Sequence, residues 1–236
     1  MTSIPLKTSD ISVIIPALNE SASIDPLADT LGTSVGEIIL VDGGSTDDTV
    51  QKAGTRGFDV IESGPGRAGQ MNAGSQRARG QVLLFLHADS LLPAGFSDLI
   101  VQALSDKKTL LCSFSLGVDT KNPVLKGIVA LANFRSRLLR LPYGDQSFSL
   151  KTQDFMELGG FADLPIMEDY ELVRKAARRG KIVTLPEQLI TSDRRWRKLG
   201  VLQTTLINQL VVAGFKCGVP PAKLASLYRK GLFGNN

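Results

Sequence analysis

The stretch "QVLLFLHADS", residues 81–90, combines an apolar run with a polar end. Residues 82–86 are all apolar, and they are followed by His87, the only histidine in the chain, and by Asp89. A continuous apolar run of this kind is typical of a strand that is buried on both faces of a parallel sheet. We therefore predict a strand over residues 81–89 whose end presents an imidazole and a carboxylate.

Similar runs recur through the first hundred residues. Strand-like segments at 11–17, 37–42 and 58–62 alternate with helix-like segments at 22–31, 46–55 and 67–79. Such alternation indicates βαβ units and a parallel sheet covered on both faces. Further along we predict a strand at 110–118 and helices at 123–139, from Met167 or Glu168 onward, at 199–217 and at 221–231. The expected fold class is α/β, with a Rossmann-like, mainly parallel sheet flanked by helices, and C-terminal helices.

Composition and charge limit the classes of function. The chain has 236 residues, 43% apolar and 21% charged, which is ordinary for a globular protein. Its net charge of +4 comes from dispersed basic residues, which suits an anionic ligand or a membrane surface better than nucleic acid. The first ten residues have no apolar core of a signal peptide, and two lone cysteines make no disulfide framework. We expect a cytoplasmic protein.

Polar residues follow several of the predicted strands. They are Asn19 and Glu20, then Asp42, and then His87 with Asp89. In open α/β sheets, ligands bind beyond the carboxyl ends of the strands, so we expect these side chains to line one crevice. Asp42 would accept hydrogen bonds from a base or a ribose, and Asp89 would hold a divalent metal, Mn²⁺ or Mg²⁺. His87 would bind Mn²⁺ more readily than Mg²⁺, contact the ligand, or be purely structural.

Two helix starts carry further candidates. In "GPGRAGQMNAG", residues 64–74, glycines surround Arg67, whose guanidinium and neighbouring N–H groups would bind a phosphate, unless the segment is only a flexible turn. In "PIMEDYELV", residues 165–173, Glu168 and Asp169 open a helix, where the dipole favours an ionised carboxylate that can act as a base. The alternative is the common preference for acids at a helix start. After strand 37–42, Ser45 would cap the next helix, with Asp48 completing a capping box.

Taken together, these motifs resemble the family 2 glycosyltransferases of the GT-A nucleotide-sugar-binding fold. The resemblance covers roughly residues 10–195 and rests on "VIIPALNE", "ILVDGGSTDDT", "GRAGQMNAG", "LLFLHADS" and "GGFADLPIMEDYEL". It is strongest toward a small bacterial subgroup with His-Ala-Asp in place of Asp-x-Asp and a late "RRW". It implies one domain over 1–236, with a nucleotide-binding half (10–110), an acceptor and catalytic half (111–195) and a C-terminal helical extension (196–236).

The resemblance also implies a role for individual residues. It implies an inverting transfer from a nucleoside-diphosphate sugar to an acceptor hydroxyl, in which Asp169 of the Glu168-Asp169 pair is the general base. The other implied contacts are the nucleoside at Pro16, Ala17 and Glu20, the base at Asp42, the phosphates at Arg67, and the metal at Asp89 with His87. Acceptor or donor-sugar contacts are expected at Asp145, Gln146, Arg195 and Trp196. Trp196 would stack on a sugar or pack half-buried, and Gly43 replaces the Asp of many relatives.

Alternatives stay open at this stage. A nucleotidyltransferase that makes nucleotide sugars would share the fold, but "PALNE" replaces its Gly-rich basic loop after the first strand. A non-catalytic nucleotide-sugar-binding protein would tolerate the His-Ala-Asp motif but would not need Asp169. The basic "RRWRKLG" segment before the helix at 199–217 indicates either peripheral contact with the inner face of a membrane or packing on the body or a second subunit.

Overall fold

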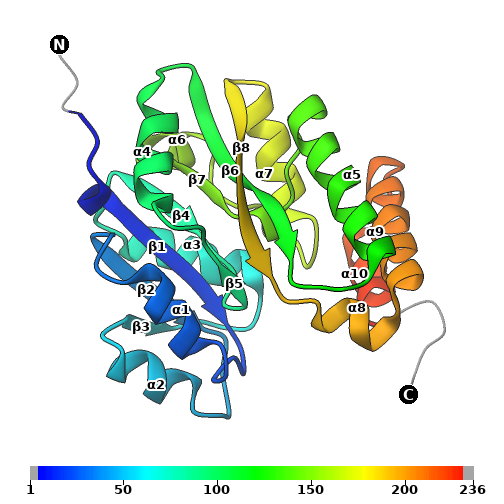
Figure 1. The fold of residues 1–236 in the computed structure, drawn as a ribbon, viewed down its shortest axis with the longest axis horizontal. Helices are drawn as coiled ribbons and strands as arrows, with labels where there is room; N and C mark the ends of the chain where they lie inside the picture. The colour runs from blue at the N-terminus through cyan, green and yellow to red at the C-terminus, as the bar shows by residue number, and fades with distance from the viewer. Residues whose placement is uncertain (1–4, 231–236) are drawn as a thin grey trace.

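The computed structural model describes residues 5–230, and its centre is a single eight-stranded sheet (Figure 1). The strand order is β3-β2-β1-β4-β7-β6-β8-β5. The bounds are β1 (Ile11–Ala17), β2 (Glu37–Asp42), β3 (Asp59–Glu62), β4 (Val82–Phe85), β5 (Ser90–Leu91), β6 (Thr109–Val118), β7 (Phe148–Lys151) and β8 (Lys181–Thr191). Strands β3, β2, β1 and β4 are parallel, as are β6 and β8, whereas β7 and β5 run antiparallel to their neighbours. The predicted α/β fold with a mainly parallel sheet is confirmed.

Helices cover both faces of this sheet. One core joins the sheet to α1, α2 and α4, and the opposite core joins it to α3, α6 and α7. Helices α5, α8, α9 and α10 gather at the side of the molecule away from β1–β3 (Figure 1). The bounds are α1 (Ile24–Leu31), α2 (Thr49–Thr55), α3 (Arg67–Arg77), α4 (Phe96–Ser105), α5 (Pro123–Leu139), α6 (Thr152–Glu157), α7 (Glu168–Ala177), α8 (Arg194–Leu199), α9 (Val201–Lys216) and α10 (Pro221–Lys230). Gly231, the last residue of the predicted final helix, lies outside the described residues.

The strand predicted over 81–89 is shorter than expected. It ends at Phe85, although Leu86 still donates its N–H to the carbonyl of Ile14 on β1. The chain then turns, with Ser90 N–H bonded to the carbonyl of His87. His87 and Asp89 therefore lie on an irregular segment beyond the sheet, because this turn redirects the chain into the short β5.

The predicted capping box is wrong. Helix α2 begins at Thr49, and Asp48 at its N-cap makes no side-chain capping bond. The Ser45 hydroxyl instead accepts the N–H of Asn19 at 2.9 Å, and Asn19 Oδ1 accepts the N–H of Thr46. These bonds tie the loop after β2 to the loop after β1, which is a tertiary role that local spacing does not reveal.

Within residues 5–230, no helix combines the length and the apolar character that a membrane-crossing segment requires.

Candidate active site

The loops after β1 and β2 form one polar edge of the sheet. Asp42 is almost fully buried, and its Oδ2 accepts the backbone N–H groups of Gly44 and Ser45, both at 2.9 Å. Its Oδ1 is buried without a hydrogen-bond partner among residues 5–230. A buried carboxylate oxygen without a donor is costly, so this atom is suited to a ligand that supplies one. The assignment of Asp42 to base recognition stays a prediction.

Gln70 explains the glycine at position 43. Its Nε2 donates to the carbonyls of Ala17 and Val41 at 2.9 and 2.8 Å, and it therefore locks α3 to β1 and β2. A Cβ on Gly43 would lie 2.9 Å from that same nitrogen. Gln70 lies inside a helix, where no pattern in the sequence marks it, and sequence reasoning missed it. Pro16 and Ala17 are predicted nucleoside contacts, and the Ala17 carbonyl already accepts this hydrogen bond from Gln70.

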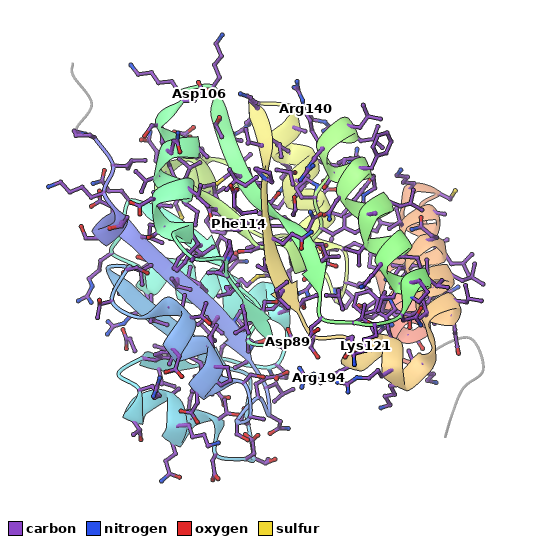
Figure 2. All side chains as sticks on the ribbon, viewed as in Figure 1. Asp89, Asp106, Phe114, Lys121, Arg140 and Arg194 are labelled. Carbon is purple, nitrogen blue, oxygen red and sulfur yellow. The ribbon has the colours of Figure 1, made fainter. Side chains whose placement is uncertain are left out.

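Glu20, Asp89 and Arg194 form what we call the outer cluster. One Arg194 NH2 nitrogen lies 2.9 and 3.0 Å from the two Glu20 carboxylate oxygens and 3.1 Å from Asp89 Oδ2. Asp89 and Arg194 are labelled next to each other beyond the strand ends in Figure 2. The Arg194 side chain is 53% exposed, and those of Glu20 and Asp89 are 21% and 25% exposed. The sequence predicted both acids but not the arginine that joins them.

Arg67, His87 and Glu168 form the inner cluster. Arg67 Nε donates to Glu168 Oε1 at 2.6 Å, and Arg67 NH1 lies 3.2 Å from His87 Nε2. Burial, followed by the Arg67 charge, lowers the pKa of His87 to about 3, so the ring is neutral and Nε2 accepts from the guanidinium. Glu168 is buried, with a side chain only 3% exposed. The structure thus joins three predicted residues from three separate segments.

Asp169 follows at the start of α7. Its Oδ2 accepts the N–H of Gly144 at 2.8 Å, and its Oδ1 accepts the N–H of Tyr170 at 2.7 Å. A Cβ on Gly144 would lie 2.9 Å from Asp169 Oδ2, so the glycine allows the close approach of the loop. Met167 precedes the helix with a φ of 72°, in the left-handed region that non-glycine residues rarely adopt. The carboxylate is therefore held by backbone on both sides.

A cavity of about 740 Å³ connects the inner cluster with Asp169. Asp145, at the cavity wall, has its pKa raised to about 6, mainly by burial and against the lowering effect of Arg135. The opposite wall comes from the C-terminal helices. The lining residues include Arg67, His87, Asp145, Glu168, Asp169, Asn208, Val211, Tyr228 and Arg229.

Three predicted acceptor contacts do not line this cavity. Gln146 is fully buried and donates to the Phe114 carbonyl and the Ser136 hydroxyl, so it supports the loop from behind. Arg195 stacks on the ring of Tyr228 at 3.6 Å and donates to its carbonyl. Trp196 is half-buried in a core between β6 and α5, which is the packing role that the sequence left as its alternative.

Comparison with known proteins identifies the family. The model described as "Glycosyl transferase family 2" matches residues 12–162. The chain belongs to glycosyl transferase family 2. This family 2 chain is 31% identical over 96 residues to the glucosyl-3-phosphoglycerate synthase of Mycobacterium tuberculosis, and 29% identical over 102 residues to a dodecaprenyl-phosphate galacturonate synthase of Rhizobium johnstonii. These matches span 35% and 37% of the chain but only 30% of each relative.

Solved structures show the same fold. The crystal structure of the M. tuberculosis synthase with phosphoglyceric acid aligns with a TM-score of 0.62 at 21% identity, over 89% of this chain and 80% of that one. The mannosyltransferase PcManGT from Pyrobaculum calidifontis, solved with GDP-Man and Mn²⁺, aligns with a TM-score of 0.65 at 20% identity, over 95% and 69%. The family 2 chain therefore has a GT-A-like fold.

The residues of this family 2 chain fit a divalent metal only if the donor supplies further ligands. Within the described part of the chain, no group of three or more His, Cys, Asp and Glu side chains is arranged to hold an ion. His87 Nε2 faces Arg67, and the Asp89 carboxylate contacts Arg194. A single carboxylate completed by substrate phosphates is a common way to hold such an ion. Metal ligation by Asp89 and by His87 stays a prediction.

Proposed function

We propose that this family 2 chain transfers a sugar from a nucleoside-diphosphate sugar to an acceptor hydroxyl, with inversion and with Asp169 as the general base. The observation that carries this proposal is the single cavity in which Arg67, His87, Glu168 and Asp169 converge from distant segments. Relatives support the donor class, because solved structures of the mycobacterial synthase and of PcManGT contain UDP-Glc and GDP-Man.

The two acids at the start of α7 have different roles in this proposal. Glu168 is buried and bonded to Arg67, so it is a positioning residue that orients the guanidinium. Asp169 lines the cavity and is held only by backbone N–H groups. A carboxylate oxygen has lone pairs beyond the one used by a single N–H, so Asp169 can still accept a proton from a bound hydroxyl. We therefore assign proton removal to Asp169.

The reaction then needs charge stabilisation at the donor. As Asp169 takes the acceptor proton, the acceptor oxygen bonds to the anomeric carbon, and the bond from that carbon to the diphosphate breaks. Arg67 places a fixed positive charge at the cavity wall, where the departing diphosphate gains negative charge. A divalent ion held by Asp89 would neutralise further charge on the leaving group. Asp42, Glu20 and the end of β1 are proposed to hold the nucleoside.

The two alternative functions are less well supported. A nucleotidyltransferase is disfavoured by the family match and by the "PALNE" segment at residues 16–20, which lacks the Gly-rich basic loop. A non-catalytic binder would have no use for the cavity-lining Asp169, which backbone donors hold on two sides.

Donor hydrolysis by the purified chain tests this proposal. UDP-, GDP- and dTDP-sugars are incubated with Mn²⁺ or Mg²⁺, and the released nucleoside diphosphate is measured for wild type, Asp169→Asn and Asp98→Asn. Asp98 is an exposed acid on α4 and serves as the matched control. Loss of a general base lowers turnover about 10²–10⁴-fold, so we expect that loss in Asp169→Asn alone. Wild-type turnover in Asp169→Asn would overturn the assignment.

A further inference from the structure

Helix α5 presents an apolar stripe to solvent. Val124, Leu131, Phe134 and Leu138 are 52%, 69%, 64% and 65% exposed. Their spacing of seven, three and four residues places them on one face of the helix. The buried face, which includes Leu125, packs on β6 instead. Scattered exposed apolar residues are ordinary, but a stripe of four along one helix is a candidate for a contact surface.

The neighbouring helix α9 carries a second exposed stripe. Leu202, Leu206 and Leu210 repeat every four residues and are 76%, 51% and 42% exposed. Helix α9 packs beside α5, and both helices lie at the side of the molecule away from β1–β3 (Figure 1). We call the seven exposed side chains on these two helices the α5–α9 ridge. The opposite face of α9 lines the catalytic cavity through Asn208 and Val211.

The segments that carry the ridge have an excess of basic residues. Residues 120–144 and 194–230 contain 13 of the 27 Lys and Arg residues of the chain and none of its 23 acidic residues. Among these 13, Arg194 binds Glu20 and Asp89, Arg195 packs on Tyr228, and Arg197 pairs with Asp193. Lys121 and Arg140 lie at the two ends of α5 (Figure 2), Lys198 lies on α8 just before α9, and Lys216 ends α9. The remainder of the chain carries the other 14 basic residues and all the acids, including Asp119 and Asp193, which directly precede the two segments.

We propose that the α5–α9 ridge is a docking surface for an anionic lipid bilayer, a property beyond sugar transfer. Apolar side chains at the headgroup boundary, bordered by Lys and Arg, are the features that bind helices to anionic membranes. A symmetric dimer through the same face would bring the lysines and arginines of the two copies close to one another, which opposes association. Docking through α9 would also place the proposed catalytic cavity beside the lipid surface, because one face of this helix belongs to the ridge and the other face lines the cavity.

Vesicle cosedimentation of the full chain tests this inference. The probes are vesicles of phosphatidylcholine alone and vesicles of phosphatidylcholine mixed with phosphatidylglycerol. We expect binding only to the anionic vesicles and weaker binding as salt increases, since salt screens the basic residues. The Phe134→Ser/Leu206→Ser double variant should bind about tenfold more weakly, equivalent to about 1.4 kcal/mol. Met156→Ser, which changes a side chain on α6 that is 49% exposed, is the matched control and should bind as wild type.

The outcomes separate this proposal from its alternatives. Far-ultraviolet circular dichroism and donor hydrolysis without vesicles should be unchanged in both variants, so that a binding defect is not a folding defect. Absence of wild-type binding to anionic vesicles at low salt overturns the proposal. So does vesicle binding that the double variant leaves intact, or a wild-type dimer in light scattering that the double variant dissociates. Failure of donor hydrolysis with intact vesicle binding would count against the proposed function only.

Discussion

Two arginine-centred clusters join distant parts of this chain, but in different surroundings. Arg67 bonds to Glu168, 101 residues away, and Arg194 bonds to Asp89, 105 residues away. Glu168 is 3% exposed and Arg67 38%, whereas Asp89 is 25% exposed and Arg194 53%. A buried ion pair loses much when one partner is removed, while an exposed pair contributes little. The inner cluster is therefore a fixed part of the site, and the outer cluster is a contact that a ligand can displace.

Removal of the buried Glu168 carboxylate should have the largest effect on stability. Glu168→Gln takes away the carboxylate that balances Arg67, and we expect the free energy of unfolding to fall by about 2–3 kcal/mol. Denaturant unfolding followed by circular dichroism measures the change. Glu171→Gln, on the same helix with a more exposed side chain, is the control and should cost under about 1 kcal/mol. Equal losses in the two variants would contradict the buried role of Glu168.

The next largest effect is expected at Gly144, where the loop backbone approaches the proposed general base Asp169. In Gly144→Ala, the new Cβ would meet Asp169 Oδ2 at 2.9 Å, so the carboxylate or the loop must shift. A displacement of the order of 1 Å in a catalytic group can cost about 10²-fold, and we expect kcat to fall by about 10–100-fold with little change in KM. Gly127→Ala on α5 has open space around its Cβ and is the matched control. Wild-type kcat in Gly144→Ala would show that the position of Asp169 is not critical.

The neutral state of His87 gives a third prediction. Its pKa is lowered to about 3, first by burial and then by Arg67, so a proton-carbon NMR titration should show an uncharged ring throughout pH 5–8. His87 is the only histidine, so its resonance is unambiguous. Because the folded-state pKa is below the ordinary value of 6.5, this residue stabilises the fold above pH 6.5, and that contribution is lost as the pH falls.

Arg67→Gln removes the second cause of that shift, so the pKa of His87 should rise toward its ordinary value. Arg77→Gln, at the other end of α3, is the control and should leave the titration unchanged. A His87 pKa near 6.5 in the wild-type chain would contradict the inner cluster as described.

Loss of the exposed contacts of Arg194 should have the smallest effect on stability. Arg194→Gln removes the bonds to Glu20 and Asp89, and we expect the free energy of unfolding to change by less than about 1 kcal/mol, because the arginine is half exposed and screened by solvent. Denaturant unfolding in parallel with Glu168→Gln gives the direct comparison. A loss from Arg194→Gln as large as that from Glu168→Gln would remove the distinction between the two clusters.

The sequence predicted the regular parts of the fold best. The predicted bounds 11–17, 37–42 and 123–139 coincide with β1, β2 and α5, since long apolar runs and a proline at a helix start are strong local signals. It missed β7 and β8 because β7 has four residues and β8 contains Pro186 and a register shift with β6. Short or irregular strands depend on their neighbours rather than on local pattern.

The sequence also predicted some parts of the candidate site better than others. Residues at strand ends and helix starts, such as Asp42, Asp89 and Asp169, carry local signals and were predicted. The pairing of these residues with their partners was not predicted, whether the partner was a predicted residue, as for Arg67 and Glu168, or an unpredicted one, as for Asp89 and Arg194. Periodicity in one sequence contains no information about which side chains meet. Arg194 was therefore missed beside the predicted Arg195 and Trp196, although it is the member of that segment that contacts Glu20 and Asp89.

The central claim is that Asp89 in the outer cluster serves the donor, whereas Asp169 in the cavity serves the acceptor. Calorimetric titration of the nucleoside diphosphate of the preferred donor, with Mn²⁺, into Asp89→Asn and Asp169→Asn tests it most directly. We predict a Kd about tenfold weaker in Asp89→Asn and within about twofold of wild type in Asp169→Asn, which should lose turnover instead. Wild-type nucleotide binding by Asp89→Asn, or loss of nucleotide binding in Asp169→Asn, would contradict this division of the site.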